Sequence, residues 1–303
     1  MDFVFHLGFN EDLAKLELET VLGKVITKIS PRKYLVELDN FSDLNTVAHR
    51  LGGLVEIRGK SNDKLVWRHQ AKEWYKRDRL KPLADGRKGM LPPKIARIMV
   101  NLALGKNYTK TQQNHRHPGL EPGSIDIDSR LRGNDRVLLD PFCGSGNILM
   151  EAGVLGLSLL GTDIDTKQLE GTRKNLSWLG VKNFKLHNFD ATQISKNIDT
   201  QVNYIVTEPF MGKPNLRPDQ IKFVTKGLHK LYLGSLKNWL KVLDVGGTVC
   251  MVFPIYSDGK KTYQLSEVID DKSLVGYNIK TRGLIYSRPN SKLKREIVVL
   301  KKK

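Results

Sequence analysis

An acidic, glycine-rich turn directly after an apolar segment is the feature that most constrains the fold of this 303-residue chain. The apolar residues Val137–Leu139 are followed by Asp140–Gly146, which reads DPFCGSG, and a helical pattern begins at Asn147. This order predicts a strand, a tight turn and a helix. Glycines let a ligand lie against bare backbone, and the first amides of the helix point at that ligand.

The position of the acid in this turn indicates the class of ligand. A dinucleotide fingerprint reads G-x-G-x-x-G, whereas here an acid and a proline precede two glycines and no third glycine follows. A carboxylate at a strand end suits a cationic, amine-bearing cofactor better than a pyrophosphate. We therefore interpret the segment as part of a binding site for S-adenosylmethionine. The alternative is an ordinary strand-turn-helix with a tight turn.

The charge balance indicates an anionic partner. The chain has 50 Lys and Arg residues against 32 Asp and Glu, a formal net charge of +18 at pH 7, and such an excess attracts polyanions. Only Cys143 and Cys250 are present, which argues against a disulfide framework or a zinc site and fits a reducing cytosol. No stretch of eighteen apolar residues and no signal peptide is found, so we expect a cytoplasmic protein without a membrane or metal partner.

The chain is predicted to contain two domains. Residues 1–60 favour a small ferredoxin-like α+β domain, residues 61–90 a basic, aromatic linker, and residues 91–303 the cofactor-binding domain. In the first domain we expect strands at Phe3–Leu7, Tyr34–Leu38 and Leu54–Ile57 and helices at Glu11–Leu22 and Leu44–Leu51.

The second domain alternates strands and helices, which predicts an α/β, doubly wound and mostly parallel sheet. A hairpin is expected at its end, and a helix near residues 262–269. Residues 105–134 hold prolines and glycines without periodicity, which predicts an inserted loop. This insertion resembles peptides translated from dispersed bacterial palindromic repeats.

Three acids follow successive strands of this domain. Because the carboxyl ends of parallel strands meet at one edge, we expect them to share a ligand. Asp140 and its turn would hold the amino-acid end of the cofactor, Asp163 the ribose hydroxyls and Asp190 the adenine amino group; the alternative is helix caps or solvated loop residues. The candidate cofactor-binding residues are Asp140, Pro141, Phe142, Cys143, Gly144, Ser145, Gly146, Asp163, Asp190 and Thr207.

A second polar turn, Glu208-Pro209-Phe210, follows the strand predicted at residues 203–206 and is the candidate catalytic segment. Methyl transfer to an exocyclic amine requires the nitrogen lone pair to leave ring conjugation. Carboxylate and carbonyl acceptors orient the amino hydrogens for this purpose. Proline stiffens the turn, and an aromatic ring stacks on an extruded base. The alternative is a strand terminator with Phe210 in the core.

Several segments resemble THUMP-associated tRNA guanosine-N2 methyltransferases. They are Asp140–Gly153, Gly89–Ala103, Phe5–Asn10 with Leu51–Gly53, and Tyr286–Pro289 with Arg295–Leu300. The resemblance implies a class I Rossmann-like methyltransferase that acts on a tRNA guanosine, with Asp163 as the ribose-binding acid and Asp190 contacting adenine. Two departures stand out. The family reads Thr-Asp-Pro-Pro-Tyr-Gly where this chain has TEPFMG, and the region before residue 90 is too short for a complete THUMP module.

Two basic clusters are candidates for RNA contact, since cations meet phosphates and interleaved aromatics stack on bases. The alternative is a solvated charged face. The first cluster comprises Lys72, Trp74, Tyr75, Lys76, Arg77, Arg79 and Lys81. The second comprises Arg282, Arg288, Lys292, Lys294, Arg295 and residues 301–303.

The sequence therefore predicts an S-adenosylmethionine-dependent RNA methyltransferase acting on the N2 amine of a guanosine, with tRNA as the expected substrate. Two alternatives stay open: an amino-methyltransferase acting on rRNA or DNA, and a catalytically inactive RNA-binding relative. The oligomeric state has no sequence signature.

Overall fold

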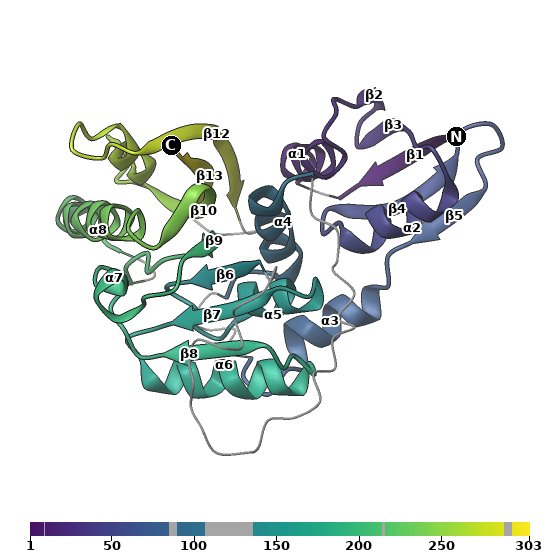
Figure 1. Ribbon diagram of the computed structural model, residues 1–303. Helices are drawn as coiled ribbons and strands as arrows, with labels where there is room; N and C mark the ends of the chain where they lie inside the picture. Colours follow the sequence, from purple (N-terminus) through teal and green to yellow (C-terminus); the bar gives the residue numbers. More distant parts are fainter. Residues whose placement is uncertain (9, 85–89, 107–135, 214–215, 288–292) are drawn as a thin grey trace, which may run out of the picture.

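The computed structural model describes residues 1–8, 10–84, 90–106, 136–213, 216–287 and 293–303, which form two sheets joined by two helices (Figure 1). All but the first two residues of the predicted insertion at 105–134 lie outside the described residues. The same holds for Arg288.

The first sheet is antiparallel and has the strand order β2-β3-β1-β4-β5. Its first four strands and two helices form the ferredoxin-like arrangement, and β5 extends this sheet into the stretch predicted to be a linker. The domain boundary at residue 60 stays a prediction. The elements are β1 (Asp2–Leu7), α1 (Glu11–Leu22), β2 (Thr27–Ser30), β3 (Lys33–Glu37), α2 (Phe41–Arg50), β4 (Leu54–Gly59) and β5 (Leu65–Arg68).

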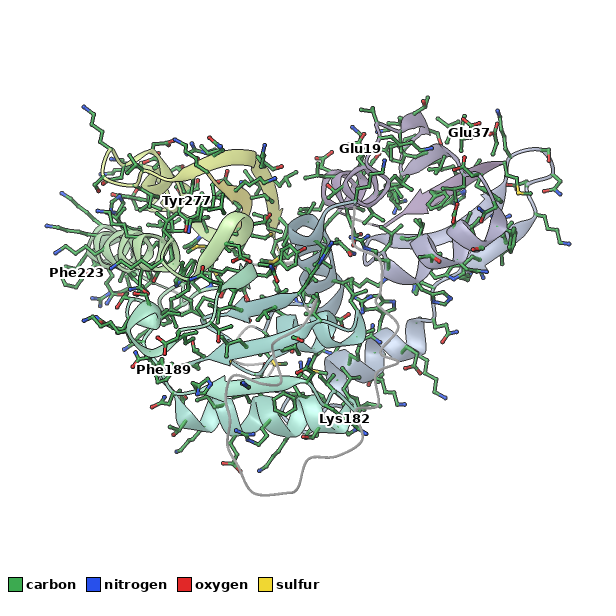
Figure 2. The ribbon with its side chains drawn as sticks, in the orientation of Figure 1. Glu19, Glu37, Lys182, Phe189, Phe223 and Tyr277 are labelled. Carbon is green, nitrogen blue, oxygen red and sulfur yellow. The ribbon has the colours of Figure 1, made fainter. Side chains whose placement is uncertain are left out.

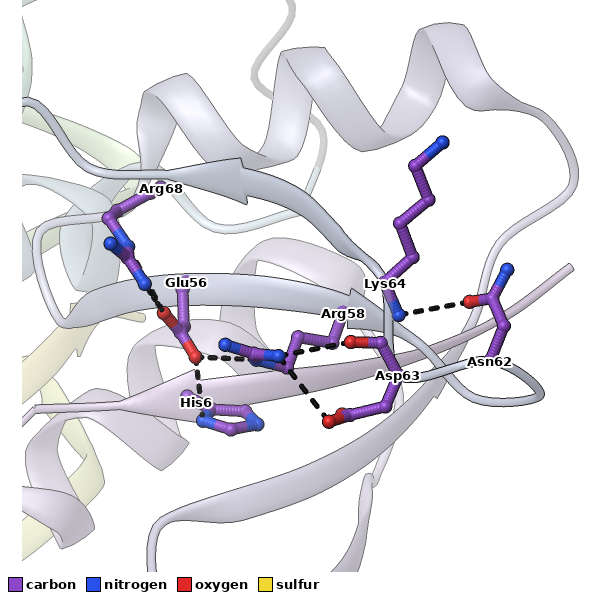
Figure 3. Close-up of polar contacts among 7 residues, drawn as sticks. All are labelled: His6, Glu56, Arg58, Asn62, Asp63, Lys64 and Arg68. Carbon is purple, nitrogen blue, oxygen red and sulfur yellow. Dashed lines mark hydrogen bonds and ion pairs between the residues drawn. The ribbon is translucent and has the colours of Figure 1, made fainter.

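One face of the first sheet packs on its helices and the other carries ion pairs. Phe3 and Phe5 on β1 are buried, whereas His6 lies on the opposite face. There Glu56 is 2.8 Å from Arg58 and 2.8 Å from Arg68, with His6 Nδ1 at 3.4 Å (Figure 3). Hydrogen bonds from Arg58 and then Arg68 lower the pKa of Glu56 to about 2. The cations of this face are therefore matched by a carboxylate that stays ionised.

The second sheet has the order β12-β13-β10-β9-β6-β7-β8. Strands β10, β9, β6, β7 and β8 are parallel, and β13 runs antiparallel to both β10 and β12, as the late hairpin predicted. The elements are β6 (Val137–Asp140), α5 (Asn147–Val154), β7 (Ser158–Thr162), α6 (Thr166–Trp178), β8 (Phe184–His187), α7 (Ile194–Asn197), β9 (Val202–Thr207), α8 (Pro218–Trp239), β10 (Leu243–Ser257), β12 (Tyr277–Ser287) and β13 (Lys294–Lys302).

The helix predicted near residues 262–269 is confirmed only for its second part, which is a 3-10 helix, η2 (Leu265–Asp270). Its first part is wrong, because Thr262–Gln264 form the short strand β11. Strand β10 runs to Ser257, and its last three residues pair with β11. Tertiary pairing therefore overrides the local helical pattern.

Two helices connect the sheets: α3 (Ala71–Arg79) and α4 (Pro93–Leu104). Figure 1 shows α4 between the two sheets, and every residue of α4 except Lys94 is buried. Glu17 of α1 is fully buried; its carboxylate accepts from the amides of Gly52 and Gly53 at 2.9 and 2.8 Å and from Asn101 of α4 at 2.6 Å. These hydrogen bonds fasten the first sheet's helix to α4.

The carboxyl edge of the parallel strands is the edge on which the predicted site residues lie. Figure 2 labels Lys182, which lies just before β8, and Phe189, which lies just after it. The carboxyl ends of the parallel strands are therefore on the side of Phe189.

Candidate active site

The switch point of the second sheet lies between β6 and β9, where open α/β sheets bind ligands beyond the strand ends. Asp140 ends β6 and Thr207 ends β9, and both are buried. The hydroxyl of Thr207 donates to Asp140 Oδ1 at 2.7 Å. This hydrogen bond joins two residues that were predicted to bind the cofactor, and the predicted catalytic segment begins directly after Thr207.

The glycine turn has a backbone that requires its glycines. Gly144 and Gly146 have φ of +50° and +83°, in the left-handed region. A Cβ on Gly146 would lie 2.8 Å from Thr172, whereas one on Gly144 would find no contact nearer than 4.0 Å. The Thr172 hydroxyl donates to the carbonyl of Gly144 at 2.6 Å. Thr172 of α6 therefore fixes the turn on one side, and the other side has space for a ligand next to Gly144.

Other residues of this turn anchor it. Pro141 and Cys143 are buried, and the ring of Phe142 packs edge-on against Trp239 of α8 with centroids 6.3 Å apart. Burial raises the pKa of the Cys143 thiol well above its ordinary value, which fits the expected spacer and not a nucleophile. Ser145 Oγ is 3.3 Å from the sulfur of Met90.

Asp163 follows β7 and faces the glycine turn. Its Oδ2 accepts from the amide of Gly144 at 2.9 Å, and its Oδ1 accepts from the amide of Asp165 at 2.9 Å. Each carboxylate oxygen has a second lone pair, so both can also accept from a ligand.

Asp190 lies three residues beyond β8, at the surface. Its Oδ1 accepts from the amide and the hydroxyl of Thr192, both at 2.8 Å. These bonds give Asp190 a local role in a turn. Its contact with adenine stays a prediction.

The carboxylates of Asp163 and Glu208 lie close enough to Asp140 to affect its pKa. The pKa of Asp140 is raised to about 7, mainly by burial, with repulsion from Asp163 and Glu208 adding to the shift. Hydrogen bonds from Thr207 and from the amide of Phe142 oppose it. A site with three neighbouring acids, one of them buried, favours a cationic ligand.

The candidate catalytic acid carries an ion pair that the sequence did not indicate. Glu208 Oε1 is 3.0 Å from Arg295 Nε on β13, and these side chains are only 13% and 6% exposed. Arg295 also lies over the ring of Tyr286, 5.7 Å from its centroid. The expectation that Arg295 belongs to a basic surface cluster is wrong. Its strand β13 lies between β10 and β12, and its side chain is buried beside Glu208.

Two tyrosines fix the turn after Glu208. Tyr232 of α8 donates to the carbonyl of Phe210 at 2.8 Å, and Tyr256 of β10 donates to the carbonyl of Met211. Pro209 is buried, but Phe210 is 58% exposed, which contradicts the alternative that placed its ring in the core. The pattern of the sequence could not identify Tyr232 and Tyr256, since both look like ordinary core aromatics.

The first basic cluster divides into two parts on α3. Lys72, Tyr75, Lys76 and Arg79 are exposed. Arg77 points inward: its Nε is 2.6 Å from Glu151 of α5, and its guanidinium lies 4.4 Å from the centroid of the Trp74 ring. The prediction that Arg77 and Trp74 belong to an open RNA-binding face is therefore corrected, because Arg77 pairs with the buried carboxylate of Glu151. The prediction for Lys81 is also wrong, because this side chain is buried and its amine donates to Asn147.

Neither a metal centre nor a membrane span is found in the part of the chain that the structure describes. No three His, Cys, Asp or Glu side chains are grouped there as metal ligands. None of the described helices combines the length and the apolar character needed to cross a bilayer.

The fold and the site together define a class I methyltransferase. The model of RMKL-like methyltransferase domains matches residues 130–283, just over half of the chain. The chain belongs to this methyltransferase domain family, whose cofactor is S-adenosylmethionine.

Individual relatives agree with this assignment. A tRNA (guanine(10)-N2)-dimethyltransferase of Methanothermobacter thermautotrophicus is 34% identical over 179 residues, 56% of this chain and 48% of the relative. One of Pyrococcus abyssi is 28% identical over 211 residues, 69% of this chain and 49% of the relative. The chain thus spans about half the length of the curated relatives it matches. The crystal structure of TrmN from Thermus thermophilus aligns over 100% of both chains with a TM-score of 0.56 and 16% identity, which supports the fold.

The residues present fit the cofactor. The turn is open at Gly144, and the carboxylates of Asp140 and Asp163 lie beside it at the switch point. A sulfonium and an ammonium are the charges that this cluster of acids would favour.

Proposed function

We propose that this protein is an S-adenosylmethionine-dependent RNA methyltransferase that methylates the N2 amine of a guanosine in tRNA. The observation that carries the proposal is the turn at Glu208–Phe210. There a nearly buried carboxylate and a solvent-exposed ring stand beside the cofactor-binding edge of the sheet. The names of the relatives point to the same reaction. We also propose that the protein acts in the cytosol, where tRNA is modified.

The cofactor-binding residues keep the roles predicted for them. We assign Asp140 and the amides of its turn to the amino-acid end of the cofactor, Asp163 to the ribose hydroxyls and Asp190 to adenine. The cofactor supplies a methyl group on sulfur that is already activated for transfer. The protein therefore contributes mainly orientation, which is worth several kcal/mol in well-aligned reactions.

The ion pair defines the role of Glu208. Because the guanidinium of Arg295 stabilises the ionised carboxylate, Glu208 is a better hydrogen-bond acceptor than a general base. It would accept one amino hydrogen of guanine, and the carbonyl of Pro209 the other, while Phe210 stacks on the base. The hydroxyls of Tyr232 and Tyr256 hold the next two carbonyls and thus keep this turn in position. The amine proton would pass to solvent, because Glu208 is held as an acceptor by its pair with Arg295.

RNA contact is assigned to the exposed side chains of α3, which are Lys72, Tyr75, Lys76 and Arg79. Arg288, from the second cluster, keeps its predicted role and lies outside the described residues. Phosphate contacts release counterions, so we expect the affinity for tRNA to fall steeply with salt concentration.

The deciding experiment is mass spectrometry of nucleosides from tRNA, rRNA and DNA, each incubated with the protein and S-adenosylmethionine. N2-methylguanosine in the tRNA digest alone would support the proposal. A methylated base in rRNA or DNA instead would support the amino-methyltransferase alternative. No product with any substrate, despite cofactor binding, would favour an inactive RNA-binding protein.

A matched pair of variants tests the catalytic assignment. Glu208→Gln should reduce transfer at least 100-fold, the low end of what such groups contribute, while cofactor affinity stays within about twofold. Glu267→Gln changes the same functional group at an exposed position of η2 and should behave as the parent. Full activity of Glu208→Gln would refute its role.

A further inference from the structure

A cavity of about 190 Å³ lies where the first sheet meets the connecting helices. Val154, the last residue of α5, lines it, so it is at the opposite end of α5 from the glycine turn. The other lining residues come from the end of α2, from β5 and the turn after it, from α3 and from α4, and they include His49, Trp67, His69, Gln70, Trp74 and Arg97. This cavity is therefore separate from the candidate active site.

Buried polar groups of the cavity lack a partner within the described part of the chain. Arg97 is 1% exposed, and its Nε makes no hydrogen bond there, although its Nη2 is 2.7 Å from Glu151. His69 Nδ1 is likewise buried without a hydrogen bond. Buried donors and acceptors in native proteins are nearly always satisfied, so unpartnered groups that line a cavity indicate a ligand.

The size and shape of the cavity favour a single planar ring system. A cavity of roughly 150 Å³ can hold benzene, whereas sites for drug-sized ligands occupy about 300–1,000 Å³. Trp67 and Trp74 supply flat walls, and His49 meets Trp67 edge-on with centroids 5.9 Å apart. Donors from Arg97 and polar groups at Gln70 can meet the edge of a base. This combination of flat apolar walls and polar edges suits a nucleobase.

The charge around the cavity favours a base that carries phosphate. The cations of Arg77, Lys94 and Arg97 lie 4.4, 5.7 and 5.6 Å from the centroid of Trp74. Glu151 pairs with two of them. The exposed Lys72 and Lys76 lie on the same helix as Trp74 and add further positive charge.

We propose that this cavity binds one unpaired base of the RNA substrate, with the adjoining phosphate held by the lysines of α3 and α4, which are not paired with Glu151. The inference rests on the proposed function, since it needs an RNA substrate. It concerns a nucleotide other than the one that is methylated, because Phe210 is at the carboxyl edge of the second sheet and the cavity is at the far end of α5. The cavity would fix the register of the RNA on the enzyme.

Binding measurements with two probes test this site. The first probe is a fluorescein-labelled tRNA transcript, titrated in the presence of S-adenosylhomocysteine. The second is quenching of tryptophan fluorescence by AMP, GMP, CMP and UMP, compared with ribose 5-phosphate. Trp67→Leu removes a flat wall and should weaken tRNA binding roughly tenfold. At least one mononucleotide should quench the parent more strongly than ribose 5-phosphate does.

A second variant protects the test against misfolding. Gln70 is exposed at the start of α3 and makes no capping hydrogen bond, so Gln70→Glu should leave the fold intact and weaken tRNA binding severalfold by charge. Gln201→Glu makes the same change at an exposed position before β9, and Phe223→Leu removes an exposed ring of α8 outside the cavity. Both controls should stay within about twofold of the parent.

The outcomes separate this proposal from the proposed function. If folded Trp67→Leu and Gln70→Glu bind tRNA like the parent, the cavity proposal is overturned, even if the parent methylates tRNA. Mononucleotide binding without an effect of either variant on tRNA would mean a site for free nucleotides, which also overturns it. A parent that binds tRNA in a Trp67-dependent manner but transfers no methyl group would refute the function and leave the site standing.

Discussion

Asp140 should couple cofactor binding to protonation. In the free protein its pKa is raised to about 7 from an ordinary value of 3.8, first by burial and then by the neighbouring Asp163 and Glu208. A ligand ammonium within about 4–6 Å favours the ionised form and would lower this pKa by roughly 1–3 units. Binding below pH 7 should therefore release a proton from Asp140.

The size of the effect follows from the titration. With a pKa near 7, about one Asp140 in eleven is ionised at pH 6 and about ten in eleven at pH 8. The Kd for S-adenosylhomocysteine, which keeps the ammonium, should thus be about tenfold weaker at pH 6 than at pH 8, or about 1.4 kcal/mol. Calorimetry in two buffers of different ionisation enthalpy should count close to one proton released at pH 6.

Asp140→Asn removes this titration, so the Kd for S-adenosylhomocysteine should not change between pH 6 and pH 8. The variant should also bind more weakly than the parent does at pH 8. Asp199→Asn, at an exposed position before β9, should keep the parent's dependence. An unchanged parent Kd between pH 6 and 8, with no proton released, would refute a protonated Asp140 beside the cofactor's ammonium.

The same group predicts a trend in stability. Because folding raises the pKa of Asp140, the folded state binds a proton that the unfolded chain loses above pH 3.8. The contribution of Asp140 to stability is therefore full below that pH and declines as the pH rises towards 7, by roughly 4 kcal/mol at most. Asn does not titrate, so Asp140→Asn should not lose stability in this way. Its free energy of unfolding should rise relative to that of the parent between pH 3.8 and pH 7.

Three further substitutions test positioning and packing. Arg295→Met leaves the carboxylate of Glu208 without its guanidinium, so kcat should fall at least tenfold with little change in KM for the cofactor; steady-state kinetics that show the reverse split would contradict this. Tyr232→Phe removes the hydrogen bond to the carbonyl of Phe210, worth about 0.5–1.5 kcal/mol, and should lower kcat severalfold without altering cofactor affinity by calorimetry. Glu17→Gln places an amide NH₂ against one of the two backbone donors in the core and should destabilise the protein by about 1–3 kcal/mol in urea denaturation; an unchanged midpoint would contradict the buried network.

Local pattern predicted the central elements well because their burial is periodic or continuous. The helix expected at Glu11–Leu22 has these bounds in the structure, and β6 lies within one residue of its prediction. Strand β2 was missed since three of its four residues are exposed and the fourth is half-buried, so no alternation marks it. β5 was missed for a similar reason: it is an edge strand whose residues are exposed or half-buried, and only its pairing with β4 defines it.

For the site, sequence could place acids at strand ends but not their partners. Asp140 and Thr207 meet because β6 and β9 are neighbours at the switch point, a consequence of the doubly wound pattern. The Glu208–Arg295 pair depends instead on register: Arg295 lies opposite Pro254 in the antiparallel ladder of β10 and β13. A shift of one residue would turn the guanidinium to the other face of the sheet, and nothing in the local sequence fixes that register.

The glycine turn also depends on the segment that connects it to the first sheet. Asn147, the first residue of α5, donates to the carbonyl of Leu91 at 2.7 Å and accepts from the buried amine of Lys81. Asn175 of α6 contacts both the amide and the carbonyl of Leu83 and donates to the carbonyl of Ser145 at 2.8 Å. The connector is therefore hydrogen-bonded to the same turn that would hold the cofactor. Helix α3 lines the proposed base-binding cavity and is followed directly by this connector. An RNA base in the cavity would therefore be held at a fixed position relative to the cofactor site.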